Sequence, residues 1–229
     1  MAPQCRCRRY PVVQGSMARA PRSTKPRLRG VSHGVGAVLL LPAIALCVRH
    51  AATDSGVVAA WVYCMSVLFL LSVSAIYHIP HWNPVPRMWL RRLDHTAIFV
   101  LIAGTYTPFC LLSFPVVGEQ LLIVVWGLAA FGALQSILWP KAPKWVSVIL
   151  YLAMGWIVLA YAKEFLAACG GTSLLLTAIG GALYSVGALI YARRWPNPRP
   201  AVFGYHEIFH VFVLAALACH YVVVWRLVG

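Results

Sequence analysis

Six side chains of the metal-ligand type gather near the ends of three apolar segments: His78, Asp94, His95, His206, Glu207 and His210. His206 and His210 are four residues apart, which stacks both imidazoles on one face of a helix. With His78 they would give one zinc ion three nitrogen ligands, and three protein ligands leave a fourth position for water, as in catalytic zinc sites. Asp94 would then hydrogen-bond that water or a histidine. Histidines at helix ends also contact lipid head groups, and this second interpretation stays open.

Two neighbouring features have competing interpretations. Residues 206–210 spell H-E-x-x-H, a string in which the glutamate acts as general base of a zinc metalloprotease. An intramembrane protease is therefore one alternative, although the sequence lacks an obvious third ligand of the type such proteases use. Ser74 lies four residues before His78 on the same predicted helix face. Spacing alone gives Ser74 only the role of a small packing residue between membrane helices.

The composition indicates which environment surrounds these residues. The 229 residues are 61% hydrophobic and only 10% charged, with a mean hydropathy of +0.78, which is typical of a membrane protein. The net charge of +14 would suit nucleic acid only if the basic residues shared a folded polar face, which the sequence does not indicate. We therefore expect anionic membrane lipids as partners and no nucleic acid, and the sequence predicts no protein partner.

Apolar segments close to the length of a membrane span recur along the chain and predict an all-α bundle of seven transmembrane helices. Proline or glycine residues separate most of them, and no separator is long enough for a soluble domain. Residues 1–30 are rich in arginine and proline without apolar periodicity, which predicts an uncleaved, disordered basic arm. Residues 31–229 form the predicted transmembrane domain, with helices over about 31–49, 57–77, 96–113, 117–138, 145–162, 173–192 and 207–226.

The distribution of lysine and arginine predicts the orientation of the bundle. Sixteen of the nineteen basic residues lie in the N-terminal arm or in the 2–3, 4–5 and 6–7 connections. Basic residues mark the cytoplasmic side of membrane proteins, so we expect the N-terminus in the cytoplasm and the C-terminus outside. With this orientation, the six side chains of metal-ligand type all lie toward the cytoplasmic face.

The order of several motifs resembles the bacterial hemolysin III family. These motifs are Ser74-Ala75-Ile76-Tyr77-His78, Arg91-Arg92-Leu93-Asp94-His95, Ala103-Gly104-Thr105-Tyr106-Thr107-Pro108-Phe109, Gly187-Ala188-Leu189-Ile190-Tyr191-Ala192 and His206-x-x-x-His210. That family belongs with the adiponectin and progestin receptors, and more distantly the alkaline ceramidases, in one superfamily of membrane-hydrolase-like proteins. The resemblance runs from about Ser32 to the end of the chain.

The resemblance implies a seven-helix fold with a cytoplasmic N-terminus and a bacterial cell-membrane location. It also implies Zn²⁺ on His78, His206 and His210, with Asp94 holding a water in the fourth position and Ser74 near the metal. Family members often carry E-x-x-N-x-x-[ST]-H before the first helix. Here Pro26 and Arg29 stand where the Glu and Asn would be.

Three classes of function follow as expectations. The first is a zinc-dependent hydrolase of lipid-like amides or esters, in which Asp94 and Ser74 are the candidate catalytic residues. The second is a pore-forming hemolysin, which the apolar helices disfavour because they carry no polar stripe to line a pore. The third is a receptor or membrane-homeostasis protein with a structural zinc ion.

Overall fold

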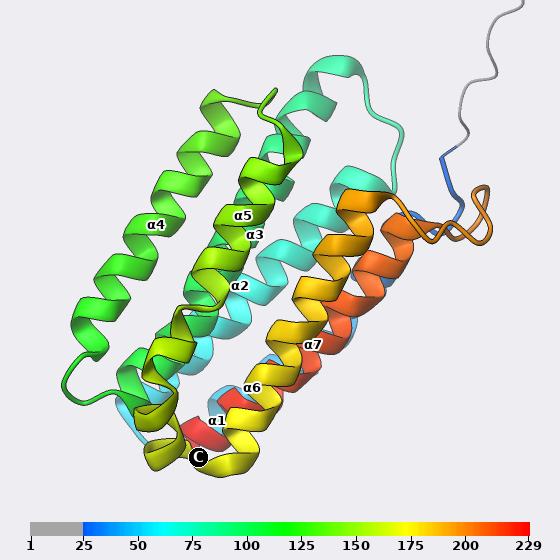
Figure 1. Ribbon diagram of the computed structural model, residues 1–229. Coiled ribbons are helices and arrows are strands. Elements are labelled where there is room, and N and C mark those ends of the chain that lie inside the picture. Colours follow the sequence, from blue (N-terminus) through cyan, green and yellow to red (C-terminus); the bar gives the residue numbers. More distant parts are fainter. Residues whose placement is uncertain (1–24) are drawn as a thin grey trace, which may run out of the picture.

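The computed structural model describes residues 25–229 and contains helices joined by short connections, with no β-strand among these residues (Figure 1). Most of the predicted N-terminal arm, residues 1–24, lies outside the described residues. The elements are α1 (Val31–His50), α2 (Asp54–His78), α3 (Pro84–Ser113), α4 (Gly118–Leu138), α5 (Lys144–Gly155), the 3₁₀ helix η1 (Ile157–Tyr161), α6 (Ala162–Arg193) and α7 (Tyr205–Val228).

Six segments of the described chain are long and apolar enough to cross a membrane. The all-α membrane class predicted from the sequence is therefore confirmed. One of the six segments, Trp145–Arg193, spans 49 residues and contains both the fifth and the sixth predicted helices. Figure 1 shows the chain reversing within it, as α5 leads into η1 and α6 returns beside α5. The count of seven spans and the orientation in the membrane remain predictions.

The start of the third helix differs from the predicted residue 96. Pro84 and Pro86 were interpreted as residues that keep helices apart, but α3 begins at Pro84. Proline suits the first turn of a helix because its missing N–H has no intrahelical acceptor there. Asp94 therefore lies about three turns inside α3 rather than at its first residue.

The fifth and sixth predicted helices also have different boundaries in the structure. The helix predicted over 145–162 ends at Gly155 and continues only as the 3₁₀ turn η1. The next helix begins at Ala162, well before the predicted residue 173, and is kinked at Gly170, whose φ of 74° departs from helical geometry. Glycine adopts positive φ without the steric penalty that a Cβ brings, so the chain bends here.

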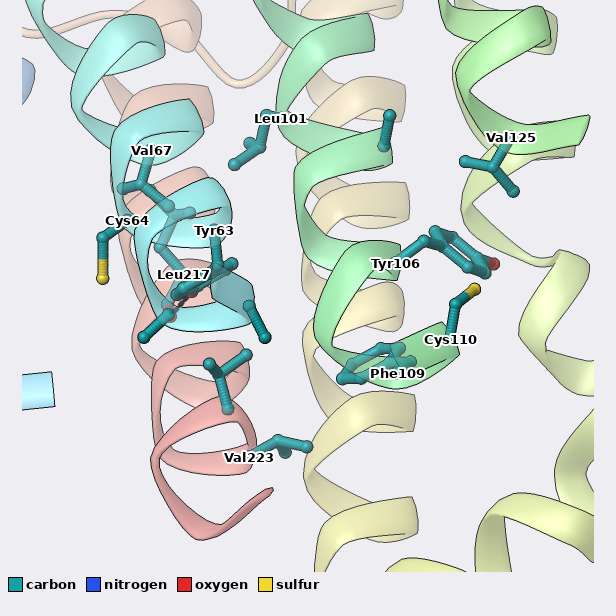
Figure 2. Packing of buried hydrophobic residues seen from close by; sticks show 14 of the residues in the cluster. Tyr63, Cys64, Val67, Leu101, Tyr106, Phe109, Cys110, Val125, Leu217 and Val223 are labelled. Atoms are coloured by element: carbon teal, nitrogen blue, oxygen red, sulfur yellow. Dashed lines mark hydrogen bonds between the residues drawn. The ribbon is translucent and has the colours of Figure 1, made fainter. Parts of the chain in front are cut away.

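The core lies between α2, α3, α4 and α7, and small residues let these helices approach closely. Figure 2 shows Tyr63 and Val67 of α2 beside Leu217 of α7, with Tyr106 and Phe109 of α3 nearby. Gly104 of α3 packs directly on Ser66 of α2. Close backbone approach through small residues is the usual way in which membrane helices gain packing energy.

The outer surface of the bundle is apolar, as expected for side chains that face lipid. Leu39 of α1 and Ile123 of α4 are each 67% exposed, and many other large apolar residues are exposed with them. A soluble monomer rarely exposes so much apolar surface. Polar side chains that are buried inside the bundle are therefore the ones that need a local explanation.

Candidate metal centre

Two helix ends bring three histidines together. His78 is the last residue of α2, while His206 and His210 lie in the first two turns of α7, and all three are buried. One ligand nitrogen from each lies within 4.8 Å of the others, and Nε2 of His206 is 3.2 Å from Nε2 of His78. The structure thus brings together the three residues that the sequence analysis assigned to a metal.

The donor set and its spacing fit zinc. Two imidazole nitrogens bound at about 2.0–2.1 Å in tetrahedral geometry lie about 3.3 Å apart, close to the His78–His206 separation. A direct hydrogen bond between two imidazoles would also explain that distance, but it would leave the third histidine without a role. Nδ1 of His210 is buried and has no protein hydrogen-bond partner. Three buried imidazoles whose ligand nitrogens lie this close together favour a shared cation over a simple pair.

Asp94 and Ser74 lie next to the histidines. Oδ2 of Asp94 is 3.9 Å from Nε2 of His78, which is too long for a direct hydrogen bond. The Ser74 hydroxyl, one helical turn before His78, is within hydrogen-bonding reach of the Asp94 carboxyl group. Asp94, Ser74, His206 and His210 all line the same cavity. A carboxylate that lines the cavity so close to the histidines is suited to contact a water or substrate oxygen held beside them.

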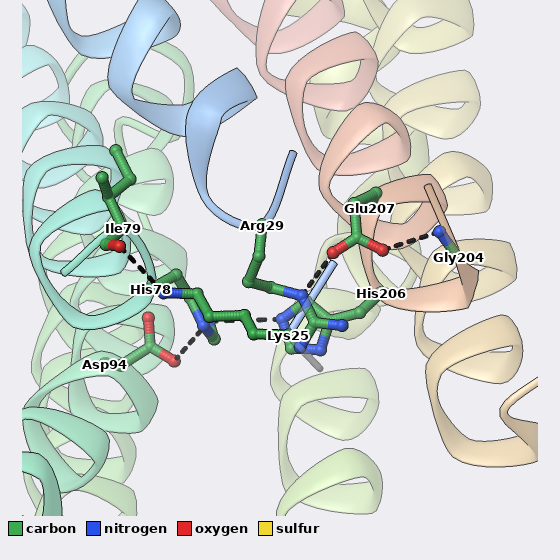
Figure 3. A network of polar contacts seen from close by, with 8 residues as sticks. All are labelled: Lys25, Arg29, His78, Ile79, Asp94, Gly204, His206 and Glu207. Carbon is green, nitrogen blue, oxygen red and sulfur yellow. Dashed lines mark hydrogen bonds and ion pairs between the residues drawn. The ribbon is translucent and has the colours of Figure 1, made fainter. Parts of the chain in front are cut away.

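Glu207 is directed away from this group, although it lies between the two histidines in the sequence. One carboxylate oxygen accepts a hydrogen bond from Nε of Arg29, and the other accepts one from the backbone N–H of Gly204 at 2.7 Å. Figure 3 shows Glu207 on the side of Arg29 and Gly204, with Asp94 on the opposite side of His78 and His206. Both oxygens of Glu207 are thus engaged in an ion pair and a helix cap. This arrangement disfavours the metalloprotease interpretation of H-E-x-x-H.

His33 gives the centre a contact from α1. Its ring stacks on that of His210 with a centroid distance of 3.8 Å and an interplanar angle of 4°, and the residue is only 2% exposed. A flat stacked neighbour restricts the orientation of the His210 ring. His95, the other histidine adjacent to Asp94, lines the cavity, and its carbonyl oxygen accepts a hydrogen bond from Tyr151.

The segment before α1, residues 25–30, lies directly over the centre; we call it the N-terminal strap. The backbone N–H groups of Arg27 and Leu28 donate to the carbonyls of Ala201 and Val202 in the α6–α7 connection. Lys25 donates to the carbonyl oxygens of Ile79 and Pro80 just after α2. Burial and the nearby Arg29 and Arg87 lower the pKa of Lys25 below its ordinary value. The strap thus connects the ends of the two helices that hold the histidines.

A cavity of about 200 Å³ begins at this centre and continues into the bundle between α3, α5, α6 and α7. Polar side chains line the end near Asp94 and His210. Further along, the lining is largely apolar and aromatic, with Leu101, Phe109 and Leu174 among its residues. Apolar pockets with a few convergent polar groups are the usual binding sites for small molecules.

A comparison with models of protein families shows to which family the chain belongs. The family model described as "Haemolysin-III related" matches residues 22–221, a region that contains every residue of the candidate centre. The chain belongs to the haemolysin-III related family. Its relatives in that family include Hemolysin-3 of Bacillus cereus, which is 36% identical over 192 residues that cover 82% of this chain and 84% of the relative.

Two further relatives of this haemolysin-III family protein show how widely the similarity extends. The Hemolysin-3 homolog of Bacillus subtilis is 35% identical over 193 residues, covering 82% of this chain and 87% of the relative. The human monocyte to macrophage differentiation factor is 27% identical over 201 residues, covering 83% and 80% of the two chains. The similarity thus extends over most of the chain in bacterial and animal relatives.

Sequence reasoning missed one residue of this haemolysin-III centre. Arg29 was assigned to a disordered arm, yet it pairs with Glu207, 178 positions further along the chain. The available signal was its position, since Arg29 stands where family members often carry Asn and lies two residues before α1. The sequence contains nothing that links Arg29 to Glu207 except their opposite charges.

Proposed function

We propose that this haemolysin-III family protein is a zinc-dependent membrane hydrolase that acts on lipid-like amides or esters. The observation that carries the proposal is that Asp94 and Ser74 line a largely apolar cavity together with two histidines of the cluster. Histidines that served only to contact lipid head groups would need no internal cavity beside them. A structural zinc site is usually closed by four protein ligands and needs no adjoining cavity, whereas here the three histidines adjoin a cavity that His206 and His210 themselves line.

When bound, zinc would polarise a substrate carbonyl and lower the pKa of a coordinated water toward about 7. His78, His206 and His210 would hold it, with the His210 ring kept in orientation by His33. The Asp94 carboxylate accepts the proton of the attacking water and later returns it to the leaving amine or alcohol. The Ser74 hydroxyl orients Asp94, and the cavity receives the apolar chain of the substrate.

The membrane arrangement forms part of the same proposal. We infer seven passes, with α5 and α6 as separate spans, a cytoplasmic N-terminus and a location in a bacterial cell membrane. The reversal of the chain between α5 and α6 supports separate passes. The basic residues Arg87, Arg91 and Arg92 lie at the same end of the bundle as His78 and support a cytoplasmic position for the centre. Membrane lipids, rather than nucleic acid, are the proposed partners.

A pore-forming activity is the second candidate, because two bacterial relatives carry the name hemolysin. The described helices present apolar side chains to their surroundings, and the lining of the cavity is largely apolar, which disfavours a hydrated path for an ion. Release of a dye from liposomes that contain the correctly inserted protein tests this alternative. Release above that of liposomes with an unrelated membrane protein would favour the pore.

The hydrolase proposal is tested with Asp94→Asn, which keeps the size of the side chain and removes its charge. Zinc content and thermal stability should match the wild type, while turnover of a panel of N-acyl amides and acyl esters should fall by about 10²-fold or more. Ser74→Ala should reduce turnover less, because Ser74 acts through Asp94. Wild-type turnover by Asp94→Asn, with zinc retained, would remove Asp94 from the chemistry. No turnover by the zinc-loaded wild-type protein would instead indicate a structural metal in a receptor or homeostasis protein.

A further inference from the structure

His220 is a buried polar residue of α7 that the proposed chemistry does not use. It lies ten residues after His210 and is 8% exposed. Its Nε2 is 3.3 Å from the carbonyl oxygen of Thr177 in α6, while its Nδ1 is buried without a hydrogen-bond partner. An ionisable side chain deep in a membrane span is costly and is usually retained for a function.

Tyr184 of α6 presents a second unpartnered group at the same place. Its hydroxyl is buried and has no hydrogen-bond partner, and its ring centroid lies 5.6 Å from that of His220. Gly180 allows this arrangement, because a Cβ at that position would meet the His220 ring. Two orphaned polar groups on neighbouring rings inside an apolar bundle indicate a missing hydrogen-bond partner.

Both residues line the cavity that begins at the histidine centre. Ten helical residues separate His210 from His220, so the two histidines lie about 15 Å apart along α7. The cavity has a volume of only about 200 Å³, and its lining is largely apolar. An elongated ligand with one chain fits such a space, with one polar end at the centre and a second polar group at His220.

The hydrogen-bonding capacity of the pair selects the kind of group. A carbonyl oxygen only accepts, so Nε2 of His220 donates to Thr177 and Nδ1 remains as an acceptor. The Tyr184 hydroxyl can donate. A ligand hydroxyl can donate to Nδ1 and accept from Tyr184 at the same time. Among the described residues of α6 and α7 that line the cavity, none is Lys, Arg, Asp or Glu, so a charged group would be left uncompensated.

We propose that His220 and Tyr184 form a hydroxyl-recognition subsite, which selects lipid-like molecules whose chain carries a hydroxyl about 15 Å from the carbonyl group at the histidine centre. The assignment of the carbonyl end rests on the proposed function. The subsite itself rests on the two orphaned groups and on the cavity that they share with His210.

The test uses zinc-loaded protein in nanodiscs and compares stearic acid with isomers that carry one hydroxyl at successive carbons of the chain. Affinity is measured by calorimetric titration. We expect one position, or two adjacent ones, to bind about tenfold more tightly than stearic acid, which corresponds to about 1.4 kcal/mol. Tyr184→Phe and His220→Phe should remove this preference and leave the affinity for stearic acid unchanged.

Tyr63→Phe is the matched control, because Tyr63 is buried, donates to the carbonyl of Leu217 and does not line the cavity. It should keep the positional preference. Equal affinity for all isomers, a preference that survives in both subsite variants, or no binding of stearic acid would each overturn the proposal. The binding assay requires no turnover. A positional preference in a zinc-loaded protein that shows no turnover would keep the subsite and overturn the proposed function.

Discussion

Arg29 and Glu207 form an ion pair that joins the N-terminal strap to the first turn of α7. Glu207 is 2% exposed, and its second carboxylate oxygen caps α7 through the N–H of Gly204. The pair therefore fixes the helix end that carries His206 and His210. The glutamate of the H-E-x-x-H pattern, Glu207, is thus a structural residue in this fold.

The first prediction concerns the stability that this pair provides. Glu207→Gln retains an oxygen that can cap Gly204 but loses the charge, and Arg29→Gln leaves the buried carboxylate without its cation. Each variant should lose about 2 kcal/mol, which for a chain of this size lowers the melting temperature by about 4–8 °C. The double variant should lose clearly less than the sum. Additive losses, measured by thermal unfolding in detergent, would argue against a direct interaction.

Glu207→Gln also separates the hydrolase from the protease interpretation. Because both oxygens of Glu207 are engaged away from the histidines, the variant should retain wild-type turnover of acyl amides or esters at a temperature well below its melting point. A glutamate acting as general base would instead lose about 10²-fold or more in rate on this change. Such a loss in a folded, zinc-loaded variant would restore the protease as the better interpretation.

The third prediction concerns the metal. His206→Ala and His210→Ala should each lower the zinc content of the purified protein from about one ion per chain toward zero, because two imidazoles hold zinc far more weakly than three. His81→Ala is the control, since His81 is an exposed histidine beyond the end of α2. Elemental analysis after gel filtration gives the stoichiometry. If His206→Ala and His210→Ala bind as much zinc as the wild type and the His81→Ala control, these histidines do not hold the metal.

The fourth prediction concerns Gly30, where the backbone of the strap lies against His78. Its φ is 82°, and a Cβ at this position would lie 2.6 Å from Cβ of His78. Gly30→Ala should therefore shift the strap or His78, reducing zinc affinity by roughly ten- to a hundredfold, as changes beside metal ligands commonly do. Competition with a chelator of known affinity measures the change. An unchanged affinity would show that the strap and the ligand move independently.

The fifth prediction tests the packing of α2 against α3. A Cβ at Gly104 would meet the side chain of Ser66, so Gly104→Ala should lower the melting temperature, with an overpacking cost of about 1–3 kcal/mol. The exposed Gly127 has no atom within 4 Å of the corresponding position, and Gly127→Ala should leave the stability nearly unchanged. Combining Gly104→Ala with Ser66→Gly should restore part of the loss, whereas equal effects of the two glycine variants would refute the close contact.

The grouping of the three histidines could be predicted because they lie where apolar segments end. His78 closes one segment, and His206 and His210 share a helix face at the beginning of another, so hydropathy and helical spacing indicated that they would meet. Their role as metal ligands remains a prediction. The start of α3 could not be predicted in this way, since Pro84 and Pro86 are compatible with either a connection or a first helical turn. Only the packing of α3 against α2 and α4 distinguishes the two.

Contacts made across the bundle were the least accessible to prediction. The stacking of His33 on His210 and the pairing of Arg29 with Glu207 each join residues more than 170 positions apart. No local pattern specifies such partners, because they depend on which helices become neighbours. The same applies to Tyr184 and His220, which appear in the sequence as ordinary residues of two apolar segments.

The division of the histidines between α2 and α7 has a consequence for biosynthesis. His78 is made early, but its two partners lie in α7, which leaves the ribosome after the other described helices. The three histidines therefore cannot come together until the described helices α1 to α6 have been made. If they hold a metal, its uptake would follow the synthesis of α7, and a chain that stops before α7 would offer zinc only one of the three imidazoles.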